Sequence, residues 1–141
     1  MSPVSNTATT ADNHPDAFWQ TRRFASTLAD ARRIIEQTIP TQSTYTRRWR
    51  HIATRELCDD NNAQPTGFDI IIEVPVIIFT DDLIVTVKHH ESDAHNIIVA
   101  VASASRIGRH DFGENRRHIA QFLRALDEWI VGSGSISGES Q

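Results

Sequence analysis

Apolar residues recur at helical spacing in two segments, one near each end of the chain. The first segment predicts a helix over about residues 26–38, which Ser26 caps and Pro40 stops. Its apolar stripe comprises Phe24, Leu28, Ala31, Ile35 and Ile39. The second segment predicts a longer helix, whose stripe comprises Ile119, Phe122, Leu123, Leu126, Trp129 and Ile130. Because an amphipathic helix is stabilised mainly by packing its apolar face, both helices should cover a sheet.

Between the two helices, apolar and polar residues alternate with the two-residue period of β-strands. The predicted strands cover residues 44–51, 68–79, 83–89 and 97–106. Pro75 cannot donate a backbone hydrogen bond, so the second strand must bend or lie at a sheet edge there. Residues 80–82 predict a tight corner, and the polar segments 59–67 and 90–96 predict loops.

Successive strands joined by short loops indicate antiparallel pairing. The predicted fold class is therefore α+β: a single two-layer domain with an antiparallel sheet of about four to five strands and an N-terminal and a C-terminal helix packed on one face. The chain has 141 residues, of which 39% are hydrophobic, and this suits one domain with a modest core. We expect a disordered arm over residues 1–15, the α+β domain over 16–131 and a flexible Gly/Ser tail over 132–141.

The charge balance bears on the class of partner. The formal net charge is −4, so no global attraction to nucleic acid or to an anionic membrane is expected, although a local basic patch is compatible with it. Arg47, Arg48 and Arg50 surround Trp49, a pattern that can bind single-stranded nucleic acid by charge and stacking. The acidic total favours an outer strand with ion-paired arginines instead, so we predict no nucleic-acid partner.

The sequence also bears on location. The first residues contain no Lys or Arg and no apolar core, so they do not resemble a secretory signal. No run approaches the roughly 18 apolar residues of a membrane span. We therefore predict a cytoplasmic protein without a membrane span. The single cysteine excludes an intrachain disulfide.

One loop gathers possible metal ligands. His89, His90 and His95 lie close to Glu91 and Asp93, and imidazoles with carboxylates suit a divalent metal. Adjacent residues on a hairpin point to opposite sides, however, and a solvated loop explains the same composition. We predict no metal and no cofactor.

His110, Asp111 and His118 raise the question of catalysis, because a His–Asp pair can act as a general base. Neighbours in sequence do not ordinarily orient each other, and Asp111 serves better as a helix cap. The chain contains no nucleophile elbow, phosphate loop or dinucleotide motif. We therefore predict no catalytic residues.

The fourth predicted strand divides small and large residues between its two faces. One face carries Ala100, Ala102 and Ala104, and the other carries Val99, Val101, Ser103 and Ser105. The alanine strip admits a close neighbour. We expect a helix or a bulky side chain such as Phe122 or Trp129 to pack there, and the floor of a ligand groove is the alternative.

Residues 103–117 form a dense polar motif between this strand and the last helix, which opens at Asp111 or Gly113 and ends at Gly132. Asp111 and Glu114 have the spacing of a capping box, which favours a braced strand-to-helix turn. An anion at the helix N-terminus is the alternative, although the same two carboxylates oppose it. The candidate residues of a binding surface or structural network here are Ser103, Ser105, Arg106, Asp111, Asn115 and Arg117.

The motif resembles the signature of a known family, the bacterial and plastid domain of unknown function 1499. The resemblance covers about residues 44–126 and is sharpest at Phe79-Thr80-Asp81-Asp82 and at residues 103–117. In the family, the second segment reads Ser-Ala-Ser-Arg-x-Gly and then Asp-x-Gly-x-Asn-Arg-Arg. The family has no agreed catalytic residues, so the resemblance implies none. It does imply that Asp81 or Asp82 meets Arg106 or Arg117 in a partly buried ion pair.

These observations leave three functional hypotheses. The first is a non-enzymatic protein-partner binding or assembly module, because no catalytic constellation occurs. The alternative is binding of a small apolar or anionic ligand between the sheet and the helices, which the alanine strip suggests. The third is an enzyme that uses Asp81, Asp82, Arg106 and His110. The sequence sets neither the partner nor the oligomeric state.

Overall fold

A computed structural model describes residues 7–58, 65–77, 79–90, 93–105 and 114–133. The strands in chain order are β1 (Thr7–Thr9), β2 (Arg22–Ala25), β3 (Ser43–Thr44), β4 (Arg47–Arg48), β5 (Arg50–Cys58), β6 (Pro65–Val76), β7 (Phe79–His90) and β8 (Asp93–Ser105). The helices are α1 (Leu28–Thr38) and α2 (Glu114–Ser133), with short 3₁₀ turns η1 (Ala17–Trp19) and η2 (Ile39–Thr41).

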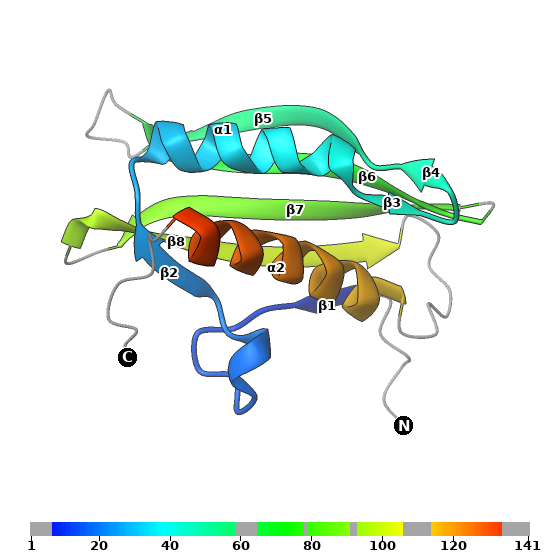
Figure 1. The fold of residues 1–141 in the computed structure, drawn as a ribbon, viewed down its shortest axis with the longest axis horizontal. Helices are drawn as coiled ribbons and strands as arrows, with labels where there is room; N and C mark the ends of the chain where they lie inside the picture. The colour runs from blue at the N-terminus through cyan, green and yellow to red at the C-terminus, as the bar shows by residue number, and fades with distance from the viewer. Residues whose placement is uncertain (1–6, 59–64, 78, 91–92, 106–113, 134–141) are drawn as a thin grey trace.

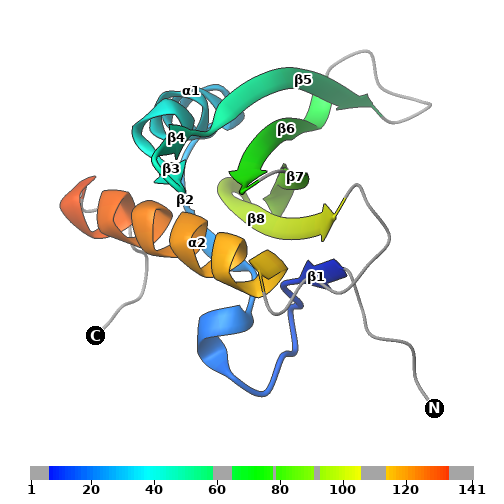
Figure 2. The same cartoon turned by 90° about the vertical axis from the view of Figure 1, so that its right-hand side faces the viewer.

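The main sheet has six strands, and every pairing in it is antiparallel. Strands β5, β6, β7 and β8 lie side by side in chain order. The free edge of β8 pairs with two short strands, β2 along its first half and β1 along its second half. Strands β3 and β4 form a separate small hairpin (Figure 1). The sheet is strongly curved, and both helices lie on one side of it (Figure 2).

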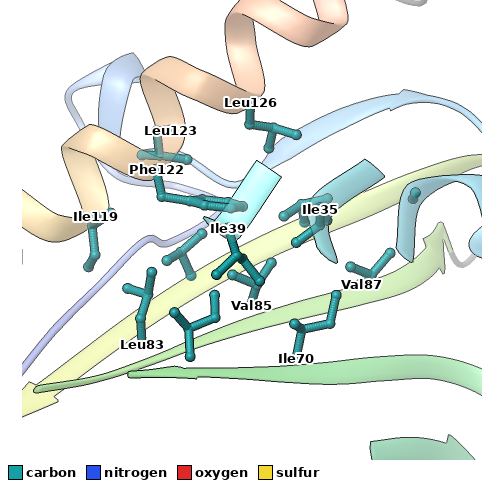
Figure 3. Close-up of a cluster of buried hydrophobic side chains, with 14 of the residues drawn as sticks. Ile35, Ile39, Ile70, Leu83, Val85, Val87, Ile119, Phe122, Leu123 and Leu126 are labelled. Carbon is teal, nitrogen blue, oxygen red and sulfur yellow. The ribbon is translucent and has the colours of Figure 1, made fainter. Parts of the chain in front are cut away.

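Both helices contribute to a single hydrophobic core. The apolar stripe of α1 meets that of α2 over the inward-facing residues of β6, β7 and β8 (Figure 3). The fully buried members include Phe24, Ile35, Ile39, Ile70, Leu83, Val85, Val99, Ile119 and Leu123. The α+β class, the antiparallel sheet and the two apolar helix stripes are thus confirmed. Within the described residues, no helix is long and apolar enough to cross a membrane.

The number of strands and the placement of the helices differ from the prediction. The sheet has six strands and the fold eight, because β1 and β2 precede α1 and the β3–β4 hairpin follows it. Strand β1 also lies within the stretch for which composition predicts a disordered arm. Short strands of this kind carry little periodic signal, since their backbone hydrogen bonds to a sheet edge need few apolar side chains.

The ends of both helices also differ. Helix α1 begins at Leu28, and Thr27 rather than Ser26 caps it, because the Thr27 hydroxyl accepts a hydrogen bond from the Asp30 N–H at 3.0 Å. Helix α2 continues past Gly132 to Ser133. The predicted start of α2 at Asp111 or Gly113 lies outside the described residues.

Residues 80–82 do not form a corner, because they lie inside β7 and pair with β6 and β8. The chain turns earlier, between the end of β6 at Val76 and the start of β7 at Phe79. Ile77 lies in this turn and has a φ of 43°. Pro75 pairs with Thr80, beyond the point where β5 stops pairing with β6 at Glu73. The proline therefore lies beyond the stretch of β6 that pairs with β5, so its missing backbone donor removes no hydrogen bond between these two strands.

Candidate functional site

Buried polar side chains gather where β7 and β8 meet the first turns of α2. Of the five buried polar or charged residues in the described part of the chain, four lie here: Asp81, Ser103, Asn115 and His118. We call these four the buried polar cluster. All are at most 4% exposed, so each must find its partners inside the protein.

Asn115 ties α2 to the end of β8. Its side-chain Oδ1 accepts a hydrogen bond from the Ser103 hydroxyl at 2.5 Å, and its Nδ2 donates to the Ser105 hydroxyl at 3.2 Å. The amide therefore satisfies both serines of the motif while remaining fully buried. Three of the predicted candidate residues are thus brought together.

His118 lies between two carboxylates. Its Nδ1 is 3.3 Å from Asp81 Oδ2, and its Nε2 is 3.2 Å from Glu114 Oε1. Only the imidazolium carries a proton on both nitrogens, so only the charged form can face both carboxylates as a donor. The Trp49 ring packs edge-on to the imidazole, with a centroid separation of 6.4 Å.

Glu114 extends this arrangement to the surface. Its Oε2 accepts a hydrogen bond from the Tyr45 hydroxyl at 2.6 Å and pairs with Arg117 Nη1 at 3.0 Å. A chain of contacts thus runs from Asp81 in β7, through α2, to the β3–β4 hairpin. Residue types alone did not reveal the contacts of Glu114 with His118 and Tyr45, although the four-residue spacing of Glu114 and His118 placed both on one helix face.

The buried polar cluster holds the fold together and offers little to a substrate. His118 is 1% exposed, and a general base must come within hydrogen-bond reach of a substrate proton. Asp81 lies beside His118; the pairing of Asp81 or Asp82 with Arg106 that the resemblance implies stays a prediction. Arg117 is mainly exposed and pairs with Glu114. Arg106, His110 and Asp111 lie outside the described residues.

The Tyr45 hydroxyl gives a direct test of this network, since Tyr45 is the single tyrosine of the chain. The hydrogen bond to Glu114, together with partial burial and the nearby carboxylate charge, raises the pKa of Tyr45 above its usual value of about 10. The stabilisation from this phenol should therefore be complete below the unfolded-state pKa and be lost as pH rises through the folded-state pKa.

We expect the ultraviolet absorbance of tyrosinate to appear at higher pH in the folded chain than in the same chain unfolded in urea. Glu114→Gln should move the folded titration toward the unfolded one, because the carboxylate acceptor is gone. Coincident titrations of the folded and unfolded chain would contradict the Tyr45–Glu114 contact.

The alanine strip lies on the face of the sheet that points away from the helices. Ile97, Val99, Val101 and Ser103 are buried in β8, whereas Ala100, Ala102 and Ala104 are half-buried or exposed. The prediction that a helix, Phe122 or Trp129 packs on the strip is therefore wrong. Both faces of β8 are apolar, so alternation alone could not show which one turns inward.

A groove of about 930 Å³ lies on this outer face, and we call it the outer groove. Its lining residues are Thr10, Ala11, Asp12, Thr21, Arg23, Thr66, Lys88, His89, His90, Ile98 and Ala100. A smaller hollow of about 180 Å³ lies further along β8, where Ala102 and Ala104 meet Asp82 and Ile84. Asp82 thus belongs to the outer face, apart from the buried Asp81 on the same strand.

Sheet register explains why two cations face each other in the outer groove. Arg23 of β2 lies opposite Ile98 of β8, and Lys88 of β7 lies opposite Ile98 from the other side. Residues that pair directly share a face, so the two basic side chains flank Ile98 at about 10 Å, two strand spacings apart. Among the described residues, no carboxylate lies within ion-pair distance of either one.

Other charges on the outer face are compensated. Arg50 pairs with Glu73 at 3.3 Å, and Arg55 lies 3.9 Å from Asp69. Asp12, the acidic residue in the lining, accepts a hydrogen bond from the Thr21 hydroxyl at 2.5 Å. His89 and His90 line the groove as single imidazoles, and the described residues contain no group of three potential ligands that could hold a metal.

The fold and the surface define a small α+β domain with two features. Buried polar side chains link the first turns of α2 to the sheet, and an open groove with basic side chains lies on the sheet face that the helices do not cover. The chain belongs to the family described as "Protein of unknown function (DUF1499)", whose model matches residues 2–126. This confirms the resemblance noted from the sequence. No curated protein and no solved structure matches the chain.

Proposed function

We propose that this protein is a non-enzymatic binding domain and that the outer groove holds an extended acidic segment of a partner protein. The observation that carries the proposal is the pair Arg23 and Lys88, which flank the apolar Ile98 without an acidic partner among the described residues. Exposed cations that no described carboxylate compensates, in a chain of net charge −4, favour an anionic ligand.

The shape of the outer groove favours a polypeptide. Arg23, Lys88 and His89 are exposed, so the groove is open along its length and would leave much of a small molecule in water. Ile98 and Ala100 form an apolar floor between polar walls. An extended segment that alternates acidic and apolar side chains would place the apolar ones on this floor and the acidic ones beside the cations.

A small amphipathic anion is a second candidate, supported by the volume of the groove, which lies within the range of ligand pockets. Its apolar part would lie over Ile98 and Ala100, and its anionic group would lie beside Arg23 or Lys88. The location differs from the sequence-based hypothesis, because the groove lies on the outer face and not between sheet and helices.

Binding of a fluorescent peptide of alternating Glu and Val tests the proposal by anisotropy at low and raised ionic strength. The double variant Arg23→Gln, Lys88→Gln should weaken binding about tenfold, since each exposed charge contact contributes up to about 1 kcal/mol. Arg33→Gln is the matched control, because Arg33 is an exposed arginine of α1 and pairs with Asp30. Its affinity should equal that of the wild type.

Each result decides between the candidates. Equal affinity of the double variant and the wild type would remove the outer groove as the peptide site. If laurate binds in a manner that depends on Arg23 and Lys88 while the peptide does not bind, the small-anion candidate replaces the partner segment. A peptide of alternating Lys and Val serves as the charge-reversed probe and should not bind.

A further inference from the structure

Apolar side chains are exposed at one end of the sheet, where the β3–β4 hairpin lies beside the β6–β7 corner (Figure 1). Among the described residues, four large hydrophobic side chains are exposed, and two of them lie here: Tyr45, between β3 and β4, and Ile77, between β6 and β7. Ile52 lies within β5, and Val131 lies near the opposite end of the molecule, in the last turn of α2. We call the surface of Tyr45, Ile77, Arg47 and Arg48 the hairpin tip.

The backbone at these exposed side chains adopts energetically unfavourable φ angles. Tyr45, Thr46 and Ile77 have φ values of 49°, 65° and 43°, a region that non-glycine residues rarely adopt and β-branched residues adopt least. Neighbouring contacts fix the corner, since Arg47 Nη2 donates to the Ile77 carbonyl and the Thr44 hydroxyl donates to the Pro75 carbonyl. Strain of this kind persists where the surroundings impose it, often at sites of interaction.

Two arginines lie at the hairpin tip, whereas the Tyr45 hydroxyl donates to the Glu114 carboxylate behind it. Arg47 and Arg48 are exposed, and each donates a hydrogen bond to a backbone carbonyl, of Ile77 and Pro40 respectively. Carbonyl contacts leave the charge of a guanidinium uncompensated. Within the described part of the chain, neither arginine lies within ion-pair distance of a carboxylate.

We propose that the hairpin tip docks on an anionic lipid surface. Ile77 would enter the boundary between headgroups and acyl chains, Tyr45 would lie at headgroup level, and Arg47 and Arg48 would meet anionic headgroups. Nucleic acid is a poorer fit, because the aromatic residue between the arginines, Trp49, is 1% exposed and cannot stack on a base.

A protein partner also fits the tip less well than a lipid surface. Protein interfaces require an extended complementary surface of about 800 Å² on each partner. Two hairpins that each expose an apolar side chain, Tyr45 in one and Ile77 in the other, provide insertion points rather than such a surface. A bilayer accepts them without a matching shape. The residues of the hairpin tip do not line the outer groove, so membrane docking by the tip does not depend on ligand binding in the groove.

Co-sedimentation with vesicles tests the proposal. The wild-type chain should sediment with phosphatidylcholine vesicles that contain phosphatidylglycerol, and at least tenfold less with phosphatidylcholine alone. Ile77→Asn should weaken binding about threefold to tenfold, because an apolar side chain that inserts is lost. Asparagine also tolerates the left-handed region, so the melting temperature of this variant should be unchanged or higher.

Two further variants distinguish vesicle binding by the hairpin tip from nonspecific adsorption of the protein. Arg48→Gln should weaken binding about fivefold and reduce its dependence on ionic strength. Val131→Asn removes a comparably exposed apolar residue far from the tip and should bind as the wild type does. The proposal fails if anionic vesicles bring down no protein, if neutral vesicles bind equally well, or if Ile77→Asn and Val131→Asn behave alike.

Discussion

Replacing His118 with leucine should lower the free energy of unfolding by about 3–5 kcal/mol. The imidazole is 1% exposed and lies 3.3 Å from Asp81, whose own side chain is 5% exposed. Leucine fills much of the space but removes the imidazole from beside the buried Asp81 carboxylate. Removal of one partner of a buried pair exposes the full cost of desolvating the other.

Urea denaturation measures this loss as a shift of the midpoint at unchanged slope. Arg117→Gln is the control on the same helix. Its side chain is mostly exposed, so the loss of its contact with Glu114 should cost less than about 1 kcal/mol. The double variant His118→Leu, Asp81→Asn should be more stable than His118→Leu alone, because a neutral amide replaces the carboxylate that has lost its imidazole neighbour. A midpoint for His118→Leu within error of the wild type would show that the pair does not brace the fold.

Replacing Phe24 with alanine should cost a similar amount, about 3–5 kcal/mol. Phe24 is fully buried in β2 and packs edge-on against Trp129 of α2, with ring centroids 5.7 Å apart. The truncation removes both the transfer free energy of a phenyl ring and its packing contacts, and it leaves a cavity. Because β2 has few other core residues, this ring anchors the strand that carries Arg23.

Chemical denaturation followed by tryptophan fluorescence measures this effect, since Trp129 reports on the cavity. Phe18→Ala is the matched control, because Phe18 lies only half-buried in η1 beside Trp19, at the edge of the core. Its loss should be much smaller than that of Phe24→Ala. Equal losses for the two variants would contradict the role of Phe24 as the anchor of β2. Phe24→Ala should also weaken peptide binding in the outer groove.

The elements that the sequence predicted best are those with a long, regular pattern. The stripe that includes Ala31 and Ile35 gave α1, and alternation around Leu83, Val85 and Val87 gave β7. Such patterns are local, because a helix or strand repeats its geometry every few residues. Strands of two to four residues were not predicted, because so few positions cannot show a two-residue period.

The candidate site was foreseen only in part. Ser103, Ser105 and Asn115 do meet, because the strand end and the helix start lie close in sequence. The contact of Asp81 with His118 was not foreseen, since β7 lies far from α2 along the chain. A groove over the alanine strip was the alternative interpretation, and Ala100 does line the outer groove. Its cations were not foreseen, because Arg23 and Lys88 are 65 positions apart and meet only through β8.

The sequence by itself determined an antiparallel α+β domain with two amphipathic helices, and it placed the chain in its family. Only the tertiary structure decided that the alanine strip faces outward, that His118 meets Asp81, and that Arg23 and Lys88 flank Ile98. The physical reason is that the periodicity of a sequence shows which residues share one face of a helix or strand, but it does not show where that face lies in the fold. Which face is buried, and which distant side chains become neighbours, depends on the register between strands and on the packing of the helices against them.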